Sequence, residues 1–546
     1  MAETSTAKPK TINSSVTSLP TPVNVAKLEE YLVNYDACGR AQLVLGFSKG
    51  FDVGFRGYPS NNKDINNLKS TREHPDIVSA AISTELAEGR MAGPFSEPPF
   101  PNFQVSPIGL VPKKTPNSFR FIVDLSSPKG ASINEGIDDV FAQVSYASLA
   151  EAIQLVILSG QGAFMAKTDI EKAFRLLPLK PEQYHLFCIK WANEYFHDRC
   201  LPMGARSSCQ LFESFSSALQ FIANQEGIGN VTHYLDDFLF VSSSHDSCQD
   251  YLQKFINICK DLNIPLAADK TFGPCQIIQF LGFEIDTIAQ VVRLPLDKLE
   301  KCKTLIHEML IQDKCTLREL QVLLGLLNFT CTVIVPGRAF LQRLYRLTVG
   351  VRKPYFSIRL TSQVKKDLHI WLQFLEEYNG VTLYREEMFL SENVCHIFSD
   401  ASKTLGCGAV LDNHWFALGW PNEWWREQNI TLLELVPIVL AIQAWGNELR
   451  NKCVILHTDN LDLSHDINSQ SSKDPLVMSL IRHMVLKLLS FNILFRSRHI
   501  PGVSNILSDS LSRLQVTRFR QLHPTADREP TPVNLPILSE ILGQQL

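Results

Sequence analysis

The sequence predicts a multidomain α+β protein. Its 546 residues are enough for three or four domains at about 150 residues each. Short strand-like runs alternate with helical runs between residues 106 and 286, and a second region of this kind covers residues 394–514. With 45% hydrophobic and 20% charged residues the chain can bury several cores. Wholesale disorder and a single small binding module are therefore excluded.

Charge and cysteine content restrict the class of protein further. Lysine plus arginine is 52 and aspartate plus glutamate is 56, a net charge of −4, so only local patches could attract nucleic acid. The 13 cysteines never form a C-x-x-C pair, which excludes a zinc knuckle and a disulfide framework and favours an intracellular location, cytoplasmic or nuclear. The N-terminus has no apolar signal region and no window is apolar enough for a membrane span, so neither secretion nor membrane binding is expected.

The N-terminal half is expected to contain three segments. Residues 1–24 are rich in Ser, Thr, Pro and Lys and predict a disordered tail. Residues 25–70 combine a short helical pattern with a glycine-interrupted segment that docks on the neighbouring domain, with no assigned role. Residues 71–290 begin with a helix over 74–91 and an extended proline-rich run, and then alternate between strands and helices.

The C-terminal half is expected to contain four segments. Residues 291–348 are amphipathic and predict a small helical bundle. Residues 349–392 connect this bundle to a second α+β domain, residues 393–515. The remaining residues, 516–546, form a C-terminal tail that is too short for another fold.

A basic stretch precedes the second α+β domain. No acidic residue occurs between Gln321 and Lys366, and this stretch carries eight basic residues: Arg338, Arg343, Arg346, Arg352, Lys353, Arg359, Lys365 and Lys366. Such a run is usually a solvated helical face. The missing acids instead favour a patch that follows a nucleic-acid backbone.

A first group of acids stands beside apolar strands. The run AKTDIEKAFRLLPL places Asp169 at the end of a strand and Phe174 on the following turn or short helix. The run THYLDDFLFVSS predicts a hairpin with Asp236 and Asp237 at its tip, preceded by Tyr234. An Asp-Asp pair is commonly only a turn. Here apolar residues flank it, so the carboxylates lie beside a core, where like charges require a neutralising cation. Oxygen ligands favour Mg²⁺, and two such ions would serve phosphoryl transfer.

A second hairpin is expected upstream of these acids. The run VPKKTPNSFRFIVDLSSP has a turn at Pro116-Asn117-Ser118 between two apolar strands, which brings Lys113 and Arg120 near each other. A solvated hairpin is the common alternative.

The ordered set of residues resembles a reverse transcriptase. Tyr234-Leu235-Asp236-Asp237 resembles the Y-x-D-D box of that family, and Asp169 resembles the aspartate of its first metal motif. The resemblance implies a right-hand polymerase, with fingers and palm in 71–290, a helical thumb in 291–348 and a connection in 349–392. It implies that Asp169 and Asp236 hold two Mg²⁺ ions, with Mn²⁺ as a substitute, and that Asp237 supports them.

The same resemblance implies roles in substrate binding. Phe174 would be the bulky gate that excludes a ribose 2′-OH, although a buried core aromatic is the alternative. Lys113 and Arg120 would grip the incoming triphosphate. Leu201-Pro202-Met203-Gly204 resembles the L-P-x-G turn beside nucleotide and template, with Met203 where retroviral members usually have Gln. Phe280-Leu281-Gly282-Phe283 resembles the hairpin that holds the primer end, and Lys270 would lie near the phosphates.

A second group of acids lies in residues 393–515. Asp400 ends a predicted strand, Glu434 lies on a predicted helix, Asp459 ends a buried strand and Asp509 lies on a helix-like run. Thr431-x-x-Glu434 also has capping-box spacing, and Asp459-Asn460 is also a plausible turn. Pro437 predicts a kink or a late start in the helix.

This order of acids resembles ribonuclease H. The resemblance implies two Mg²⁺ ions that cut the RNA strand of an RNA–DNA hybrid. His499, ten residues before Asp509, would assist product release or proton transfer, although a lone histidine is more often structural.

Together the two groups resemble a retrotransposon cassette that copies RNA into DNA and removes the spent template. Tyrosine-recombinase elements of the DIRS type are the first choice and gypsy-like elements the second. The implied partners are an RNA template, a DNA primer, their hybrid, deoxynucleoside triphosphates and other products of the element, such as a recombinase or a capsid-like protein. Protease, integrase and recombinase motifs are not visible, which predicts one product of a larger element or a truncated copy. The alternatives are a catalytically inactive nucleic-acid-binding scaffold and a ribonuclease H whose polymerase is inactive.

Overall fold

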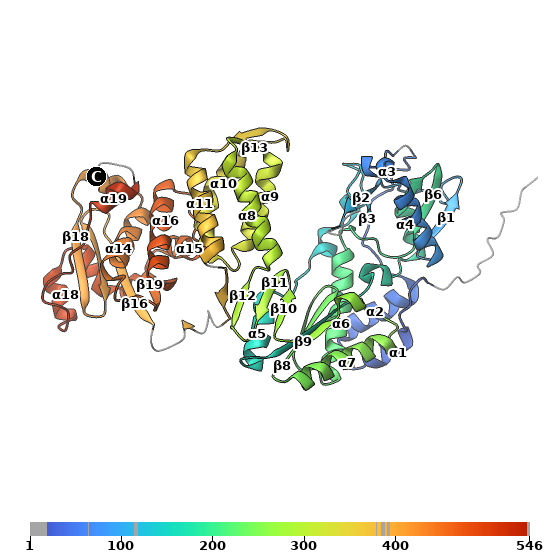
Figure 1. Ribbon diagram of the computed structural model, residues 1–546, viewed down its shortest axis with the longest axis horizontal. Helices are drawn as coiled ribbons and strands as arrows, with labels where there is room; N and C mark the ends of the chain where they lie inside the picture. Colours follow the sequence, from blue (N-terminus) through green and yellow to red (C-terminus); the bar gives the residue numbers. More distant parts are fainter. Residues whose placement is uncertain are drawn as a thin grey trace, which may run out of the picture. The chain divides into compact units, whose positions relative to one another are not determined.

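The computed structural model describes residues 19–63, 65–113, 118–377, 379–383, 388–389 and 394–542. The first 18 residues of the expected tail and the expected turn residues Pro116 and Asn117 lie outside this set. The chain divides into two compact units, Met1–Leu281 and Gly282–Leu546 (Figure 1). Both are α+β, so the multidomain α+β fold predicted from the sequence is confirmed.

The segment 25–70 contributes to the main core of the first unit. It forms α1 (Val25–Tyr31) and α2 (Ala37–Lys49), so the first part of the run expected as a glycine-interrupted segment is helical, up to Lys49, and the rest of that run, residues 50–55, is not. Leu28 of α1, Leu32 at its C-terminal end and Phe47 of α2 are buried in one cluster with Phe215 of α6 (Ser208–Gln225). This segment therefore completes the core beneath the sheet that carries the first group of acids.

The upper part of the first unit in Figure 1 consists of small sheets covered by helices. Strands β1, β6 and β5 form one antiparallel sheet, and β2 and β3 form a hairpin with Val111 opposite Arg120. The elements are α3 (Lys69–Glu73), α4 (Pro75–Ala87), β1 (Met91–Phe95), β2 (Ile108–Pro112), β3 (Phe119–Val123), η1 (Asn134–Gly136), η2 (Asp139–Ala142), η4 (Pro181–Leu186), β5 (Cys188–Trp191) and β6 (Glu194–Asp198).

The central sheet of the first unit has the order β7-β8-β4-β9 and is antiparallel. Its strand β8 is almost entirely buried, and α5, α6 and α7 pack against the sheet. The elements are α5 (Leu149–Ser159), β4 (Phe164–Asp169), η3 (Ala173–Leu176), α6 (Ser208–Gln225), β7 (Val231–Tyr234), β8 (Asp237–Ser242), α7 (His245–Asp261), η5 (Ala268–Lys270), β9 (Phe272–Cys275) and β10 (Ile277–Phe280).

The second unit begins with strands and a helical bundle. Figure 1 shows β13 at the end of the bundle remote from β11 and β12. Helix α11 lies within residues 349–392, the segment expected to connect the bundle to the next domain, and it packs on α8 of the bundle. The elements are β11 (Phe283–Asp286), β12 (Val291–Arg293), α8 (Leu296–Ile311), β13 (Lys314–Thr316), α9 (Leu317–Thr330), η6 (Val335–Phe340), α10 (Gln342–Thr348), β14 (Ser357–Arg359), α11 (Ser362–Glu377) and β15 (Val381–Thr382).

The rest of the second unit is built on a mixed five-stranded sheet of order β18-β17-β16-β19-β20. β16, β17 and β18 are antiparallel, whereas β16, β19 and β20 are parallel. The strands are β16 (Cys395–Ala401), β17 (Gly406–Leu411), β18 (His414–Gly419), β19 (Cys453–Thr458) and β20 (Leu494–His499). The helices are α13 (Glu423–Glu427), α14 (Ile430–Trp445), α15 (Leu461–Ser469), α16 (Pro475–Ser490), η7 (Gly502–Ser504), α17 (Ile506–Ser512), α18 (Val516–Leu522) and α19 (Ile537–Leu542).

Three sequence expectations need comment. α14 begins at Ile430, well before Pro437, so the late helix start was wrong. Its N-cap is Asn429, whose side chain accepts from Thr431 N, and therefore Thr431-x-x-Glu434 is not a capping box. The segment named a tail contains α18 and α19, with Phe519 buried.

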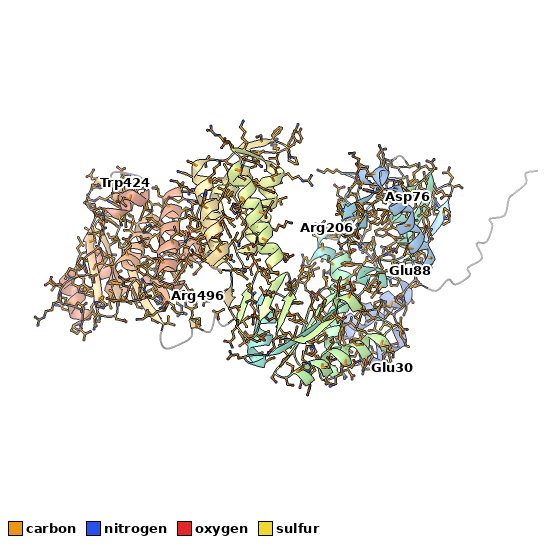
Figure 2. All side chains as sticks on the ribbon, viewed as in Figure 1. Glu30, Asp76, Glu88, Arg206, Trp424 and Arg496 are labelled. Atoms are coloured by element: carbon orange, nitrogen blue, oxygen red, sulfur yellow. The ribbon has the colours of Figure 1, made fainter. Side chains whose placement is uncertain are left out.

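Side chains fill the interior of both units (Figure 2).

Across the described ranges, no helix combines the length and apolar character needed to cross a bilayer.

Candidate active sites

The first group of acids meets at one end of the central sheet. Asp169 is the last residue of β4, and Asp237 opens β8 directly opposite it. Leu235 and Asp236 form the two-residue turn between β7 and β8. Leu235 has φ +53°, a left-handed conformation that costs a non-glycine residue about 1–3 kcal/mol. The amide of Ile170 donates to Asp236 O at 2.9 Å. The hairpin tip predicted from the sequence is therefore tied to the end of β4.

The electrostatics of this group are those of crowded carboxylates. Burial, and then the charge of Asp169, raises the pKa of Asp236. Burial raises the pKa of Asp237 to about 6, against the opposing effect of Lys167. Lys270 Nζ lies 2.9 Å from both carboxylate oxygens of Asp169. An ammonium group therefore already neutralises part of the negative charge, as a metal ion would.

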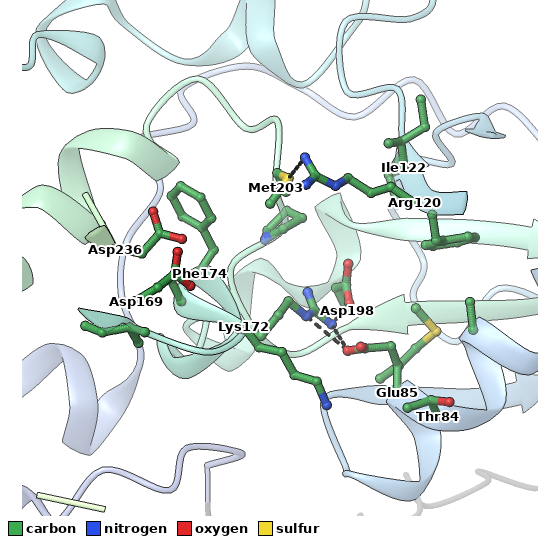
Figure 3. A pocket seen from close by; sticks show the side chains of 18 of the residues that line it. Thr84, Glu85, Arg120, Ile122, Asp169, Lys172, Phe174, Asp198, Met203 and Asp236 are labelled. Atoms are coloured by element: carbon green, nitrogen blue, oxygen red, sulfur yellow. Dashed lines mark hydrogen bonds and ion pairs between the residues drawn. The ribbon is translucent and has the colours of Figure 1, made fainter. Parts of the chain in front are cut away.

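These carboxylates border a cavity of about 410 Å³. In Figure 3 the Asp169 and Asp236 carboxylates face each other, and the Phe174 ring lies beside them. Arg120, Met203 and Lys270 also line the cavity. Six of the residues singled out from the sequence thus converge on one space: Arg120, Asp169, Phe174, Met203, Asp236 and Lys270.

Phe174 is held between the cavity and the core. Its ring centroid is 5.3 Å from that of Phe212, and it is partly buried. The next residue, Arg175, donates to Glu85 at 2.7 Å, to Asp198 at 2.6 Å and to Cys200 O at 3.2 Å. This buried guanidinium fixes the short helix η3 to α4, to β6 and to the start of the Leu201–Gly204 turn. Sequence reasoning missed Arg175, because its carboxylate partners are far away along the chain.

Of the other residues predicted to bind substrate in the first unit, some lie at the cavity and others lie outside its lining. Arg120 Nη1 is 3.9 Å from Met203 Sδ. Gly204 has φ +103°, and its carbonyl oxygen accepts a hydrogen bond from the side-chain amide of Asn134. Lys113 is exposed; its amide donates to Ser118 O, one step further along the hairpin, and it does not line the cavity. Tyr234 packs its ring 4.9 Å from Tyr146 and also lies outside the lining.

The second group of acids is more tightly gathered. Asp400, Glu434 and Asp459 each place a carboxylate oxygen within 4.8 Å of the others, the one such group of three among the residues described. Parallel pairing of β16 with β19 brings Asp400 and Asp459 to the same end of the sheet, and α14 supplies Glu434. Glu434 Oε1 accepts from Ala401 N at 3.3 Å, while Oε2 is buried without a hydrogen bond.

Burial dominates the electrostatics of Asp400 and Glu434. It raises the pKa of Asp400 to about 6, with further increases from Asp459 and Asp509. It also raises the pKa of Glu434 well above its ordinary value, and the negative charges of Asp400 and Asp459 raise it further. Two buried acids and the partly exposed Asp459, with one orphaned oxygen on Glu434, are a donor set that fits a divalent cation with oxygen ligands.

Asp509 stands beside the trio rather than within it. It lies on α17, and Arg513 Nε donates to its Oδ1 at 2.7 Å. α17 is fastened to β16 by Asn505, whose side chain donates to Ser399 O at 2.9 Å, and by Ser512, whose hydroxyl donates to Asp400 Oδ2. Sequence reasoning missed Asn505 and Ser512. The small polar residues at regular spacing in NILSDSLS were the available signal.

His499 ends β20 opposite Thr458 of β19. Its Nε2 is 3.2 Å from Asp459 O, and the side chain is exposed. The histidine therefore lies at the edge of the second acidic group, within reach of solvent.

Fewer residues of the basic stretch are free to bind nucleic acid than the sequence indicated, because some of them form ion pairs. Arg343 pairs with Asp367 at 2.7 Å, and Lys365 pairs with Asp313 at 3.0 Å. Both acids lie just outside the acid-free window, so counting within the window missed them. Arg343 is consequently a structural residue and a poor probe of nucleic-acid binding.

The sequence around the first site has known relatives. Residues 111–285 match the family described as "Reverse transcriptase (RNA-dependent DNA polymerase)". This region is homologous to reverse transcriptases. The reverse transcriptase region includes the end of β2 and the whole of β3, β4, β7 and β8, and with them Asp169, Asp236 and Asp237.

Curated viral proteins resemble the chain over this region and beyond it. The Pro-Pol polyprotein of feline foamy virus is 27% identical over 196 residues, which are 36% of this chain and 16% of that protein. The Gag-Pro-Pol polyprotein of human T-cell leukemia virus 2 is 26% identical over 315 residues, 55% of this chain and 19% of that protein. Protein P of duck hepatitis B virus (strain China) is 26% identical over 179 residues, 32% and 22%. The chain thus spans less than a quarter of the length of these relatives.

Solved reverse transcriptases share the fold. The foamy viral protease-reverse transcriptase in complex with an RNA/DNA hybrid matches with a TM-score of 0.51 and 17% identity, over 90% of this chain and 64% of that chain. The same protein in complex with dsDNA matches with a TM-score of 0.50 and 16% identity, over 88% and 98%. The fold of the chain is that of a reverse transcriptase with a mixed-sheet C-terminal domain.

Proposed function

We propose that the chain is an RNA-directed DNA polymerase that also degrades the RNA strand of its hybrid product. The observation that carries the first activity is the pair Asp169 and Asp236, whose carboxylates face each other at the border of a cavity; both residues belong to the region homologous to reverse transcriptases. Clustered carboxylates repel phosphate, so binding alone does not call for them. This argues against the alternative of an inactive scaffold.

Each residue of the first site has a role that suits its position. Asp169 and Asp236 would hold Mg²⁺, or Mn²⁺, with Asp237 behind them; when bound, the ions stabilise charge on the reacting phosphate. Arg120 would neutralise the triphosphate, assisted by Lys113. Phe174 would stand against the sugar and exclude a 2′-OH, and the Met203–Gly204 turn would border the template base. Lys270, now on Asp169, would move to a phosphate oxygen when the cation of the substrate complex takes its place.

The second site supports hydrolysis of RNA. Asp400, Glu434 and Asp459 would hold divalent metal, because they converge within 4.8 Å and leave Glu434 Oε2 unpartnered. Asp509 would assist from α17, and exposed His499 would carry a proton or hasten product departure. The foamy viral relative was solved with an RNA/DNA hybrid. A hybrid is the substrate we propose here.

The proposed setting is a mobile retroelement. The partners would be an RNA template, a DNA primer, deoxynucleoside triphosphates and other products of the same element, such as a recombinase or a capsid-like protein. Affiliation to the DIRS type, with gypsy-like elements second, rests on the sequence runs described above. The chain would act inside the cell.

One observation favours a second candidate function, ribonuclease H activity alone. In the first site Lys270 donates to both carboxylate oxygens of Asp169. In the second site the three carboxylates already lie close together, and Glu434 Oε2 has no hydrogen-bond partner. If Lys270 does not leave Asp169, the polymerase site is blocked while the second site remains competent.

A paired assay separates these two functions. Purified chain with Mg²⁺ is given an RNA template with a DNA primer and deoxynucleotides, and separately a labelled RNA–DNA hybrid. Asp236→Asn should reduce extension by roughly a thousandfold or more and leave hybrid cleavage intact, and Asp459→Asn should do the converse. Asp246→Asn and Asp462→Asn, exposed acids of the same units, are the controls. Extension that survives Asp236→Asn would show that the polymerase site is wrongly assigned.

A further inference from the structure

Two adjacent aromatic rings of the second unit are exposed to solvent. Tyr355 is 68% exposed and Phe356 is 45% exposed, on the loop between α10 and β14. Their ring centroids are 5.4 Å apart in an edge-to-face arrangement. Large aromatic side chains are usually buried, so an exposed adjacent pair marks a surface that binds something.

The backbone holds this loop in one conformation. The amide of Phe356 donates to Lys353 O at 3.0 Å, which closes a four-residue turn with Pro354 at its second position, where proline is favoured. The amides of Arg318 and Leu317 donate to Pro354 O and Phe356 O at 2.9 and 3.0 Å. The rings are thus presented on a rigid loop, and little conformational entropy is lost when a ligand binds.

Basic residues lie on the turn and on the segments that pair with it. β13 pairs with β14 so that Lys314 lies opposite Arg359, and the backbone contact with Pro354 brings Arg318 beside the turn. No carboxylate of the described residues lies within ion-pair distance of the five exposed cations in this neighbourhood: Lys314, Arg318, Arg352, Lys353 and Arg359.

The nearby acids are already engaged. Asp313 pairs with Lys365, and Glu319 accepts from the amide and hydroxyl of Thr316 in a capping box. Lys353 Nζ lies 5.8 and 5.7 Å from the ring centroids of Tyr355 and Phe356. The surface therefore combines positive charge with π faces, and none of its five cations forms an ion pair with a described carboxylate.

We propose that this surface, the Tyr355–Phe356 platform with its five cations, binds single-stranded nucleic acid by stacking unpaired bases on the rings. The faces of paired bases are covered by their neighbours in a duplex, so exposed rings can stack only on bases that are unpaired. The cations contact the phosphates on either side. Recognition is independent of base sequence, because every base has a π face.

This site differs from a track for a duplex backbone. A backbone track needs cations alone, whereas here the aromatic pair stands among the cations and is held rigid by the turn. The platform is a property of the second unit, and its binding is measured without catalysis. Failure of the polymerase assay would leave it untouched.

The first experiment measures affinity for a probe. Fluorescence anisotropy of the full chain with a labelled oligodeoxythymidylate of about 12 nucleotides is compared with a duplex of the same length. Tyr355→Ala/Phe356→Ala should weaken single-strand binding roughly tenfold and duplex binding by no more than about twofold. Tyr58→Ala, which removes a 96% exposed ring from the first unit, is the matched control. Tyr355→Phe keeps the ring and should bind as the unchanged protein does.

The second experiment separates stacking from charge. Arg352→Gln/Lys353→Gln should reduce the slope of log affinity against log salt by about 1.4, two phosphate contacts at about 0.7 each on a single strand. The aromatic double variant should leave that slope unchanged. A bromodeoxyuridine-labelled strand should cross-link on irradiation to the peptide that contains Tyr355.

Two results would overturn the proposal. Single-strand affinity of the aromatic double variant equal to that of Tyr58→Ala would show that the rings do not bind bases. Loss of self-association in that variant, measured by light scattering, with oligonucleotide affinity unchanged would assign the platform to a protein interface instead.

Discussion

The hydroxyl of Ser512 donates a hydrogen bond to Asp400 Oδ2 and so joins α17 to the acidic end of β16. Ser512 is fully buried, and a Cβ on Gly408 of the adjacent strand would lie 2.4 Å from Leu511 Cβ. The close approach of α17 to the sheet therefore depends on a glycine beneath it. It places a serine where it orients one carboxylate of the proposed ribonuclease H site.

Removing this hydroxyl should impair hybrid cleavage. A hydrogen bond to a charged group contributes about 1.5–3 kcal/mol, so Ser512→Ala should lower the cleavage rate roughly tenfold or more. Primer extension should be unchanged. Ser510→Ala is the matched control, because Ser510 is also buried on α17 but donates only to Ile506 O of its own helix. Equal cleavage rates for the two variants would deny Ser512 this role.

The second site should destabilise the metal-free protein at neutral pH. Burial raises the pKa of Asp400 to about 6 from an ordinary 3.8, so its contribution to stability is complete below about pH 4 and is lost as pH rises through 6. The loss is about 3 kcal/mol. Asp400→Asn should therefore raise the melting temperature in EDTA at pH 8 but not at pH 4. A melting temperature raised equally at both pH values would contradict the assigned direction.

Arg175 should be essential for the stability of the first unit. It is buried against Asp198 and Glu85. Its removal leaves the buried Asp198 carboxylate without its ion-pair partner and leaves Glu85 paired with Arg90 alone, which costs about 3–5 kcal/mol. Urea unfolding of Arg175→Met at pH 7 measures this. Lys172→Met, which removes the exposed pair with Glu88, should cost less than about 1 kcal/mol.

The same network predicts a dependence on pH. Burial raises the pKa of Glu85, but its ion pairs with Arg90 and Arg175 outweigh that effect and lower the pKa from 4.5 to about 2. The stability that Glu85 contributes is therefore present above about pH 4.5 and is lost as pH falls toward 2. The difference in unfolding free energy between the unchanged protein and Arg175→Met should shrink over that range. A constant difference would show that Glu85 is not held by Arg175.

Phe174 should determine the choice of sugar. Its ring borders the cavity beside Asp169 and packs on Phe212, so Phe174→Val opens space where a 2′-OH would lie. The ratio of kcat/KM for deoxynucleotides over ribonucleotides should fall roughly ten- to a hundredfold. Phe212→Leu, on the buried side of that contact, should change the ratio little. A ratio that Phe174→Val leaves unchanged would make Phe174 a core residue only.

Local sequence pattern was sufficient for positions that depend on strand ends. Asp169 closes β4, Asp236 lies in a two-residue turn, and Asp400 and Asp459 end parallel neighbours; alternation and turn residues revealed each of them. Once the strands are known, their pairing alone, parallel or antiparallel, brings the residues at their ends close together. The acids could therefore be named from the sequence.

Contacts between distant segments could not be predicted in this way. Arg343 looked like part of a basic patch until folding brought Asp367 to it, and Ser512 is an ordinary helix residue until β16 lies beneath it. Pro437 looked like a helix breaker, but the strongly apolar residues around it bury α14 and keep it helical. Tertiary packing outweighs local propensity at these positions.

The burial of Leu28 and Phe47 beside Phe215 has a practical consequence. A fragment cut at the borders of the homologous region, residues 111–285, would lose α1 and α2 and expose the underside of its own sheet to water. Such a fragment would aggregate rather than report on catalysis. Expression should therefore start upstream of Val23, whose side chain is the first buried one along the described part of the chain.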